Sequence, residues 1–465
     1  MTSPGNSSPN LLQSAGAFLR SAARRFAVDR AVAYIFVNKF LFFLRGPVTI
    51  IFIVRFLSPE QQGIWYAFTS LSALSVFADL GFTYIITQLV SHEYAGLQLE
   101  KGLITGREDA VDRFFSLVKF SLRFYTAVIL AASALLIVIG YFFFISRGEP
   151  IFLAWCLFAV IGGANLFLSL LQSIYQGLNK VAEIQKILFV CSFVTPVLSW
   201  LFLFWGLGIW TLVLSGIVGI SLSLTLLART APAFWKQVID YKVKGNIPWL
   251  RQLLPLQGKY AVSWVSGYFI FNLFVPVTFQ ICGAVTAGQL GITLAVLKAL
   301  FDTSNSWIDS RIPQFNMLVS DNKRVELMSL FRKYAFHGVC FFVFGALGLM
   351  GTLCALNYYH FYETRFLPPL LIAALLMHDF AELLIGFMGK YLRAHKDEPY
   401  YLLSLLGGVM VPAILFFALP RWGLWGVAVG LNILKWLVGF PLAITIFRKF
   451  VEEHEGRHFT VGREA

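Results

Sequence analysis

The sequence has little charge and few cysteines. Charged residues make up 13% of the 465 residues, whereas hydrophobic residues make up 58%. A chain with so few charges and so much apolar surface is not a soluble globular protein. The cysteines have neither metal-ligand spacing nor the pattern of a disulfide framework, so we interpret them as apolar packing residues and predict no metal site. They are Cys156, Cys191, Cys282, Cys340 and Cys354.

Enzyme motifs are also missing. The sequence contains no Walker-type phosphate loop, no Gly-x-Ser-x-Gly elbow and no His-Glu-x-x-His motif. We therefore predict a protein that is not an enzyme and needs no cofactor, and we exclude ATP hydrolysis by a Walker-type module. A membrane glycosyltransferase or ligase is a distant alternative. It would need a large extracytoplasmic loop with catalytic residues, and the largest such loop, around Asn357–Arg365, is short.

What the sequence does contain is a series of long apolar runs. Runs of about 20 residues match the length at which an α-helix crosses the hydrocarbon core of a bilayer. Such helices also satisfy their own backbone hydrogen bonds in lipid. We therefore predict an all-α integral membrane protein with about twelve spans. Their approximate bounds are 31–56, 64–90, 114–145, 151–174, 187–206, 209–229, 253–280, 287–309, 334–356, 366–389, 400–419 and 424–447.

The net charge of +13 is distributed to one side of these spans. Most of the 37 Lys and Arg residues lie in or beside the terminal segments and alternate loops, in groups such as Lys101–Arg123, Lys236–Lys259 and Arg311–Lys333. The positive-inside rule then places both termini in the cytoplasm. This distribution indicates a multi-pass protein of a cytoplasmic membrane and does not indicate nucleic-acid binding. The opposite side has few basic residues, namely Arg55, Arg147, Arg365 and Arg421.

Three pairs of similar segments indicate an internal duplication. Pro47-Val48-Thr49 is echoed by Pro276-Val277-Thr278, and the segments that follow align Gln61 with Gln289 and Gly63 with Gly291. Any single match has a simpler explanation in chance similarity between membrane sequences, but ordered matches at similar offsets favour duplication. Two similar halves with a substrate site between them are a common transporter plan. The other pairs are Tyr175–Lys180 with Tyr391–Lys396, and Trp205–Gly208 with Trp422–Trp425.

The duplication predicts two pseudo-symmetric six-helix lobes. Residues 31–230 form the N-lobe and residues 253–450 form the C-lobe, with a cytoplasmic linker at 231–252. Residues 1–30 are predicted to form a basic amphipathic segment on the anionic inner leaflet, where it contacts membrane lipids. Residues 451–465 form a cytoplasmic tail.

Cations inside the spans are the candidate substrate contacts, because charge within a membrane is expensive to retain. Arg45 lies beside the Gly46-Pro47 kink and shares a helix face with Asn38. Lys298 lies near the middle of its span, although Asp302, four residues later, can neutralise it. A purely structural pairing or a snorkelling side chain is the alternative for each. The candidates are Arg45, Lys39, Lys298, Lys435 and Asn38.

Acidic residues inside the spans are the candidates for ion coupling or gating. Asp379 and Glu382 are three residues apart beside His378, so the two carboxylates can share a proton or a cation. If Lys435 is their counter-ion, the cluster is structural instead. Asp79 can pair with a cation of the first span, bind a coupling ion, or cap a helix break at Gly81. The candidates are Asp79, Asp379, Glu382, His378 and Asp302.

Two segments resemble a known family. The turn Phe56–Trp65 and the helix end Phe77–Phe82 resemble Wzx-type O-antigen and polysaccharide repeat-unit flippases of the multidrug/oligosaccharidyl-lipid/polysaccharide exporter (MOP) superfamily. The helix ends at Tyr175–Lys180 and Tyr391–Lys396 also fit that family. The resemblance implies a MATE-like exporter fold that works by alternating access.

The resemblance also implies a substrate and partners. The substrate would be an undecaprenyl-diphosphate-linked oligosaccharide, moved from the cytoplasmic to the periplasmic leaflet of the bacterial inner membrane. A polysaccharide polymerase and a chain-length regulator would be its partners. Each lobe already packs against the other lobe of the same chain, so we predict a monomer. The main alternative is an H⁺- or Na⁺-coupled multidrug antiporter of the same superfamily. A lipid II flippase of that superfamily usually has two additional spans.

Overall fold

The computed structural model describes residues 45–100, 102–245, 247–251, 253, 272–358, 365–395 and 400–461. These residues are almost entirely helical, which confirms the all-α class that the sequence predicts. Within them, eight helices are long and apolar enough to cross a membrane, or nine if a bent helix pair is counted as one span. Most of the predicted first and seventh spans lies outside the described residues, so the number twelve stays a prediction.

The N-terminal bundle contains the elements up to α10. Residues 45–56 are helical, and α3 then begins with a capping box: Gln61 N donates to Ser58 Oγ, and Ser58 N donates to Gln61 Oε1, each at 3.1 Å. The elements are α3 (Pro59–Ser72), η1 (Ala73–Ser75), α4 (Val76–Asp79), α5 (Phe82–Tyr94), β1 (Gln98–Glu100), β2 (Leu103–Thr105), α6 (Glu108–Phe144), η2 (Ile145–Arg147), α7 (Glu149–Gly177), α8 (Val181–Phe204), α9 (Trp210–Thr230) and α10 (Pro232–Asp240).

The C-terminal bundle contains the remaining helices. Its last part includes a π-helix, η3, between two α-helices, and π-helical turns are frequent at functional sites. The elements are α12 (Phe274–Cys282), α13 (Ala284–Asp309), α14 (Ile312–Ser320), α15 (Arg324–Tyr358), α16 (Pro369–Ala394), α17 (Tyr401–Asn432), η3 (Ile433–Gly439) and α18 (Phe440–Val461).

Helix α17 is in fact a helical hairpin. Its backbone leaves the helical region at Gly423, which has φ 61° and ψ −158°. The two arms pack closely against each other. A Cβ added at Gly430 would lie 2.7 Å from Ile414 Cγ2, and one added at Gly426 would lie 3.4 Å from Ala418 Cβ. The turn separates the predicted eleventh and twelfth spans. A positive φ is accessible to glycine without the steric cost that a Cβ would add.

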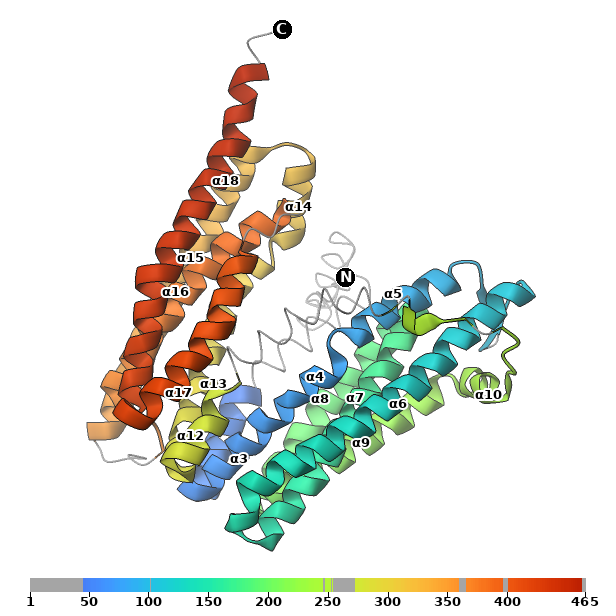
Figure 1. Cartoon of the computed structure of the whole chain (residues 1–465), viewed down its shortest axis with the longest axis horizontal. Coiled ribbons are helices and arrows are strands. Elements are labelled where there is room, and N and C mark those ends of the chain that lie inside the picture. The colour runs from blue at the N-terminus through green and yellow to red at the C-terminus, as the bar shows by residue number, and fades with distance from the viewer. Residues whose placement is uncertain are drawn as a thin grey trace, which may run out of the picture.

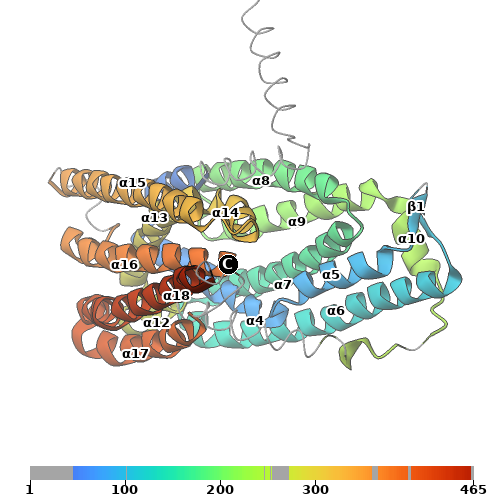
Figure 2. The same cartoon turned by 90° about the horizontal axis from the view of Figure 1, so that it is seen from above.

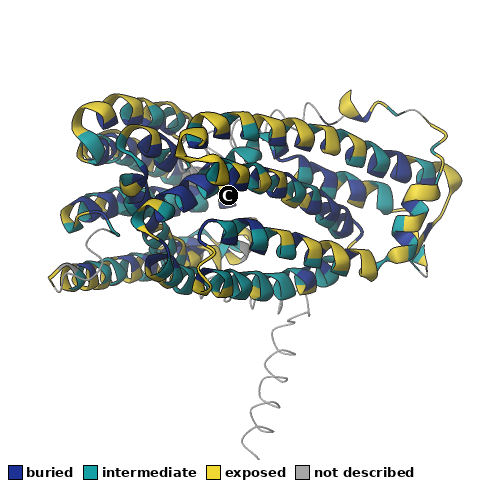
Figure 3. Cartoon of the chain, turned by 90° about the horizontal axis from the view of Figure 1, so that it is seen from below, coloured by how far each residue is buried: buried dark blue, intermediate teal, exposed yellow. Residues whose placement is uncertain are grey.

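The two bundles join at one end and diverge toward the other (Figure 1). They are joined where α3 packs against α12 and α13, around an apolar cluster that contains Ile64 and Phe68 of the first bundle and Phe279 and Ala287 of the second. In Figure 3 the buried residues follow the inner sides of the bundles and this junction, whereas the exposed residues follow their outer sides. Basic residues gather at the diverging ends, on α10 and α18 and in the turns before and after α14, for example Lys236, Arg448, Arg311 and Lys323.

Small residues bring α3 and α13 into close contact at this junction. A Cβ at Gly63 would lie 1.9 Å from the Ala284 carbonyl oxygen, and one at Gly288 would lie 2.7 Å from Gly63 N. Gly63 and Ala67 on α3, and Ala284 and Gly288 on α13, are each four residues apart, the spacing that lets two membrane helices approach. The two segments that the sequence pairs as repeats therefore pack directly against each other.

The connection after α9 folds onto the N-terminal bundle. The Gln237 side chain accepts from Ile104 N at 2.7 Å and donates to Ile104 O at 2.9 Å, which fixes α10 against the β1–β2 hairpin. Trp249 is buried and donates to Ser116 Oγ at 3.0 Å. Most of the segment predicted as a linker is thus packed against the first bundle.

Candidate functional site

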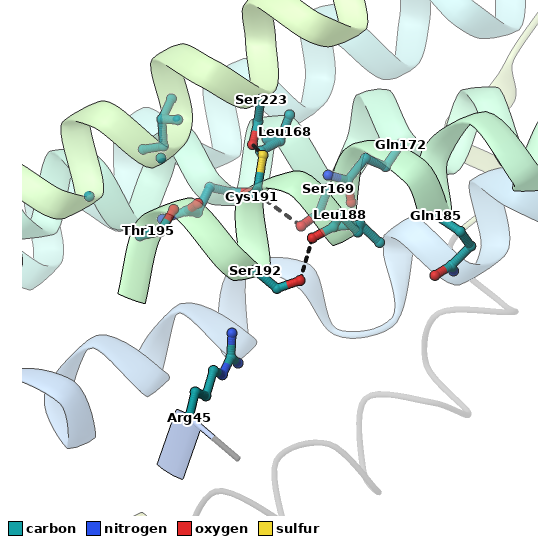
Figure 4. A pocket seen from close by; sticks show the side chains of 14 residues that line it. Arg45, Leu168, Ser169, Gln172, Gln185, Leu188, Cys191, Ser192, Thr195 and Ser223 are labelled. Carbon is teal, nitrogen blue, oxygen red and sulfur yellow. Dashed lines mark hydrogen bonds between the residues drawn. The ribbon is translucent and has the colours of Figure 1, made fainter. Parts of the chain in front are cut away.

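A pocket with a partly polar lining, called here the polar pocket, lies within the N-terminal bundle, between α7, α8 and α9 and beside Arg45 (Figure 4). Its volume is about 500 Å³, within the range of small-molecule sites. Its polar lining consists of hydroxyl, amide and thiol side chains along the three helices. These side chains are Asn165, Ser169 and Gln172 of α7, Gln185, Cys191, Ser192 and Thr195 of α8, and Ser223 of α9.

Helical periodicity explains why these side chains converge. Asn165, Ser169 and Gln172 are separated by four and three residues, so they share one face of α7. Ser192 and Thr195 are three residues apart on α8. Asn165 and Ser169 are exposed at mid-helix, and a polar face at that depth belongs against protein or water rather than hydrocarbon.

This polar face was not predicted from the sequence, because the candidates were the charged residues within the spans and Asn38, which shares a helix face with one of them. The signal that could have found it is the spacing of uncharged polar residues along the fourth, fifth and sixth spans. Glycines help to close the pocket from the α9 side: a Cβ at Gly219 would lie 2.9 Å from Thr195 Oγ1. A larger residue there would push α9 away from α8.

Arg45 is the charged residue of this pocket. It stands at the start of the described chain, and Figure 4 shows its side chain pointing from its own helix toward α8. It thus brings a guanidinium, with several N–H donors in a planar fork, to the edge of a site lined by hydroxyls and amides. Lys39 and Asn38, the other candidates of the first span, lie outside the described residues.

Lys298 and Asp302 lie on the face of α13 that is turned toward the first bundle. Gly291 contacts Tyr66 of α3, and Lys298 and Asp302 follow it seven and eleven residues later, on the same side of the helix. The two side chains form an i,i+4 ion pair of 3.0 Å and are exposed. Toward the diverging end, Asp309 on the same face pairs with Lys390 of α16 at 2.7 Å.

The tenth-span cluster is organised as two pairs. Glu382 of α16 forms an ion pair with Lys435 of the π-helix η3, and both side chains are largely buried. His378 Nδ1 lies 3.2 Å from Asp379 Oδ1. Asn432 and Trp436, next to Lys435, donate to the carbonyl oxygens of α16. Lys435 therefore stands as the counter-ion of Glu382 near the middle of the second bundle, away from the Arg45 pocket.

Asp79 caps a break in the second span. Leu80 and Gly81 both have positive φ, at 43° and 81°, and the helix bends by 41° between α4 and α5. The Asp79 carboxylate accepts from Thr83 N and Thr83 Oγ1, and from Tyr125 Oη at 2.6 Å. These hydrogen bonds fit one of the roles predicted from the sequence, a cap of the helix break at Gly81.

We expect Asp79→Ala to destabilise the protein by about 1–3 kcal/mol, because the buried Tyr125 hydroxyl loses its acceptor and α5 loses its cap. Thermal unfolding in detergent measures the loss. Asp302→Ala is the matched control, since an exposed i,i+4 pair contributes about 0.5 kcal/mol or less. An Asp79→Ala melting temperature equal to that of Asp302→Ala would contradict the capping role.

Solved structures of other proteins have a fold similar to that of this chain. No protein-family model matches the chain, and no curated protein matches it. Among solved structures, the lipid II flippase MurJ in its inward closed conformation has 12% identity and a TM-score of 0.63, and the match covers 90% of this chain and 87% of that one.

Two multidrug transporters are also similar. An inward-facing MATE transporter of the MOP superfamily has 12% identity and a TM-score of 0.54, over 88% of this chain and 98% of that one. The MATE multidrug transporter DinF-BH has 13% identity and a TM-score of 0.51, over 90% of this chain and 94% of that one. The chain is a multi-pass membrane protein with the helical exporter fold that the lipid II flippase and the multidrug transporters share.

Proposed function

We propose that this protein is a flippase for a lipid-linked oligosaccharide, in the manner of Wzx-type repeat-unit flippases. The observation that carries the proposal is the polar pocket at mid-helix depth with Arg45 at its edge. Hydroxyl and amide side chains suit a sugar, which presents donors and acceptors but no charge. A guanidinium suits the diphosphate, which it binds through charge-assisted, bidentate hydrogen bonds.

The direction of transport follows from the distribution of charge. The bundles diverge toward the ends that carry the basic residues, and the positive-inside rule assigns those ends to the cytoplasm. This conformation then faces inward, with the α3–α13 junction as the closed extracytoplasmic side. The polyprenyl tail stays in lipid while the head group passes between the bundles, and the glycan reaches the periplasmic leaflet when the junction opens. Both termini are cytoplasmic in this orientation.

For coupling to an ion gradient we propose the second bundle, where the Glu382–Lys435 pair would act both as a structural contact and as a site of protonation. Asp379 and Glu382, with His378 and Lys435, form its buried charged cluster, separate from the Arg45 pocket. Protonation of Glu382 would release Lys435 and change the packing of η3 against α16. The protein works as a monomer, and a polymerase and a chain-length regulator receive the flipped oligosaccharide on the periplasmic side.

A multidrug antiporter is the alternative, because MATE transporters share the fold. A cationic drug favours an acidic site. The pocket's lining contains Arg45 and no carboxylate among the described residues, and Glu382 is paired with a lysine. The charge of the pocket therefore supports an anionic substrate.

We expect Arg45→Gln to reduce flipping roughly 10- to 100-fold, because a charge-assisted hydrogen bond contributes about 1.5–3 kcal/mol. The purified protein is reconstituted into liposomes with a polyprenyl-diphosphate-linked oligosaccharide, and an impermeant glycosidase reports how much glycan reaches the outer leaflet. Arg45→Lys keeps the charge but not the planar fork, so we expect an intermediate rate.

Arg421→Gln is the matched control, since Arg421 is exposed, lies over the Phe417 ring and is remote from the pocket. Equal flipping rates for wild type and Arg45→Gln would mean that Arg45 does not bind the substrate. If wild type flips no glycan but exports a cationic dye in exchange for protons or sodium ions, the antiporter is the correct function.

A further inference from the structure

A second cationic cluster lies on the C-terminal bundle, between α13, α14 and α15. The Arg311 guanidinium carbon lies 4.4 Å from the centre of the Tyr334 ring, and Lys333 Nζ lies 5.9 Å from the same ring. His337, one turn along α15, stacks on Trp307 of α13 with ring centres 5.5 Å apart. Two cations, a histidine and two aromatic rings thus form one continuous patch, called here the α13–α15 cluster.

Parts of this cluster have no hydrogen-bond acceptor within the described chain. Arg311 Nε and His337 Nδ1 are buried, and the described residues offer neither a partner. Within the same ranges, no carboxylate forms an ion pair with Arg311 or Lys333. Buried polar atoms are normally satisfied, so an unpaired guanidinium N–H beside a membrane helix calls for an anionic partner.

The α13 side of the cluster faces away from Lys298 and the first bundle. Trp307 follows Lys298 by nine residues, which is two and a half helical turns, so it projects from the opposite side of α13. On α15 the neighbouring residues include Phe336 and Phe344, which are 66% and 72% exposed. Figure 2 places α15 at the edge of the molecule. Exposed phenylalanines at that edge indicate a surface covered by acyl chains.

The position of each side chain along the bundle indicates which part of a lipid it would contact. Arg311 and Lys333 lie near the diverging ends, among other basic residues, whereas the exposed phenylalanines extend toward the middle of α15. Tryptophan and tyrosine prefer the level of the head groups. A molecule on this surface would therefore place a charged head at Arg311 and Lys333 and its chains along Phe336 and Phe344.

We propose that the α13–α15 cluster is a binding site for an anionic glycerophospholipid of the cytoplasmic leaflet. Its phosphate contacts Arg311 and Lys333, and its acyl chains lie along α15. Basic pockets between membrane helices on the cytoplasmic side are known to hold anionic head groups. Because α13 also contributes Gly288 to the junction with α3, a lipid held here contacts a helix that must move when the junction opens.

The test is lipid retention. The protein is incorporated into nanodiscs of equal phosphatidylglycerol and phosphatidylcholine, released, and analysed for bound lipid by native mass spectrometry. We expect wild type to retain phosphatidylglycerol preferentially. Arg311→Gln and Lys333→Gln should each weaken that retention about fivefold, the effect typical of one basic residue at an anionic surface.

Arg332→Gln is the control, because Arg332 is an exposed neighbour on α15 without an aromatic contact in the described structure. Arg311→Lys keeps the charge and should restore retention, which separates loss of the site from a folding defect. An equal loss in Arg332→Gln, or no loss in any variant, would overturn the proposal. So would a site that retains a polyprenyl diphosphate in preference to phosphatidylglycerol, since the cluster would then belong to the substrate path.

Discussion

Lys435→Met is expected to destabilise the protein by about 3–5 kcal/mol, because it leaves the Glu382 carboxylate charged, largely buried and without its counter-ion. The loss appears as a fall in melting temperature in detergent micelles. Lys298→Met is the matched control: it removes a lysine from an exposed i,i+4 pair, which contributes less than about 1 kcal/mol. If the two variants melt at the same temperature, the Glu382–Lys435 pair stabilises the protein no more than an exposed ion pair does.

The double variant Glu382→Gln with Lys435→Met separates structure from coupling. Removal of both charges at once should recover most of the stability, since neither partner is then left unpaired. If flipping recovers too and still responds to a proton gradient, the pair is structural only. We expect stability to recover while the response to the gradient is lost, because the proposed coupling needs the Glu382 carboxylate. If flipping by the double variant still responds to the proton gradient, Asp379 is the coupling residue instead of Glu382.

Gly63→Ala is expected to push the two bundles apart at their junction. The added Cβ would lie 1.9 Å from the Ala284 carbonyl oxygen, a backbone atom that cannot move without shifting α13. Overpacking of this kind costs about 1–3 kcal/mol, enough to shift a conformational equilibrium roughly 5- to 150-fold. The strain exists only while the junction is closed, so the variant should favour the conformation in which it is open.

Spin labels on α10 and after α14, at Lys236 and Asn322, measure this shift by pulsed electron resonance in a background without the five native cysteines. We expect Gly63→Ala to increase the population of short distances, as the diverging ends approach when the junction opens. Gly348→Ala is the control, because a Cβ there meets nothing within 4 Å. Unchanged distances in Gly63→Ala would mean that this junction does not separate.

The polar pocket illustrates what sequence reasoning can and cannot find. Apart from Arg45, the polar side chains that line it are uncharged. Single serines and glutamines are common in membrane helices for packing reasons, so none is distinctive alone. Their function appears only when α7, α8 and α9 turn their polar faces toward one another. Arg45 was predictable because a charge inside a span is costly, but its association with α8 is a tertiary contact.

The amino-acid sequence by itself determined the class of the protein, because a helix in lipid must be long, apolar and internally hydrogen-bonded. It also predicted the duplication and the charged residues that need partners. Only the tertiary structure decided which partners they have. Glu382 and Lys435 are more than fifty residues apart, and Gly63 meets Gly288 rather than its repeat partner Gly291 across the bundles. These contacts depend on how separate helices cross. Local sequence patterns specify a helix and its faces; the neighbour of each face is decided by packing of the whole chain.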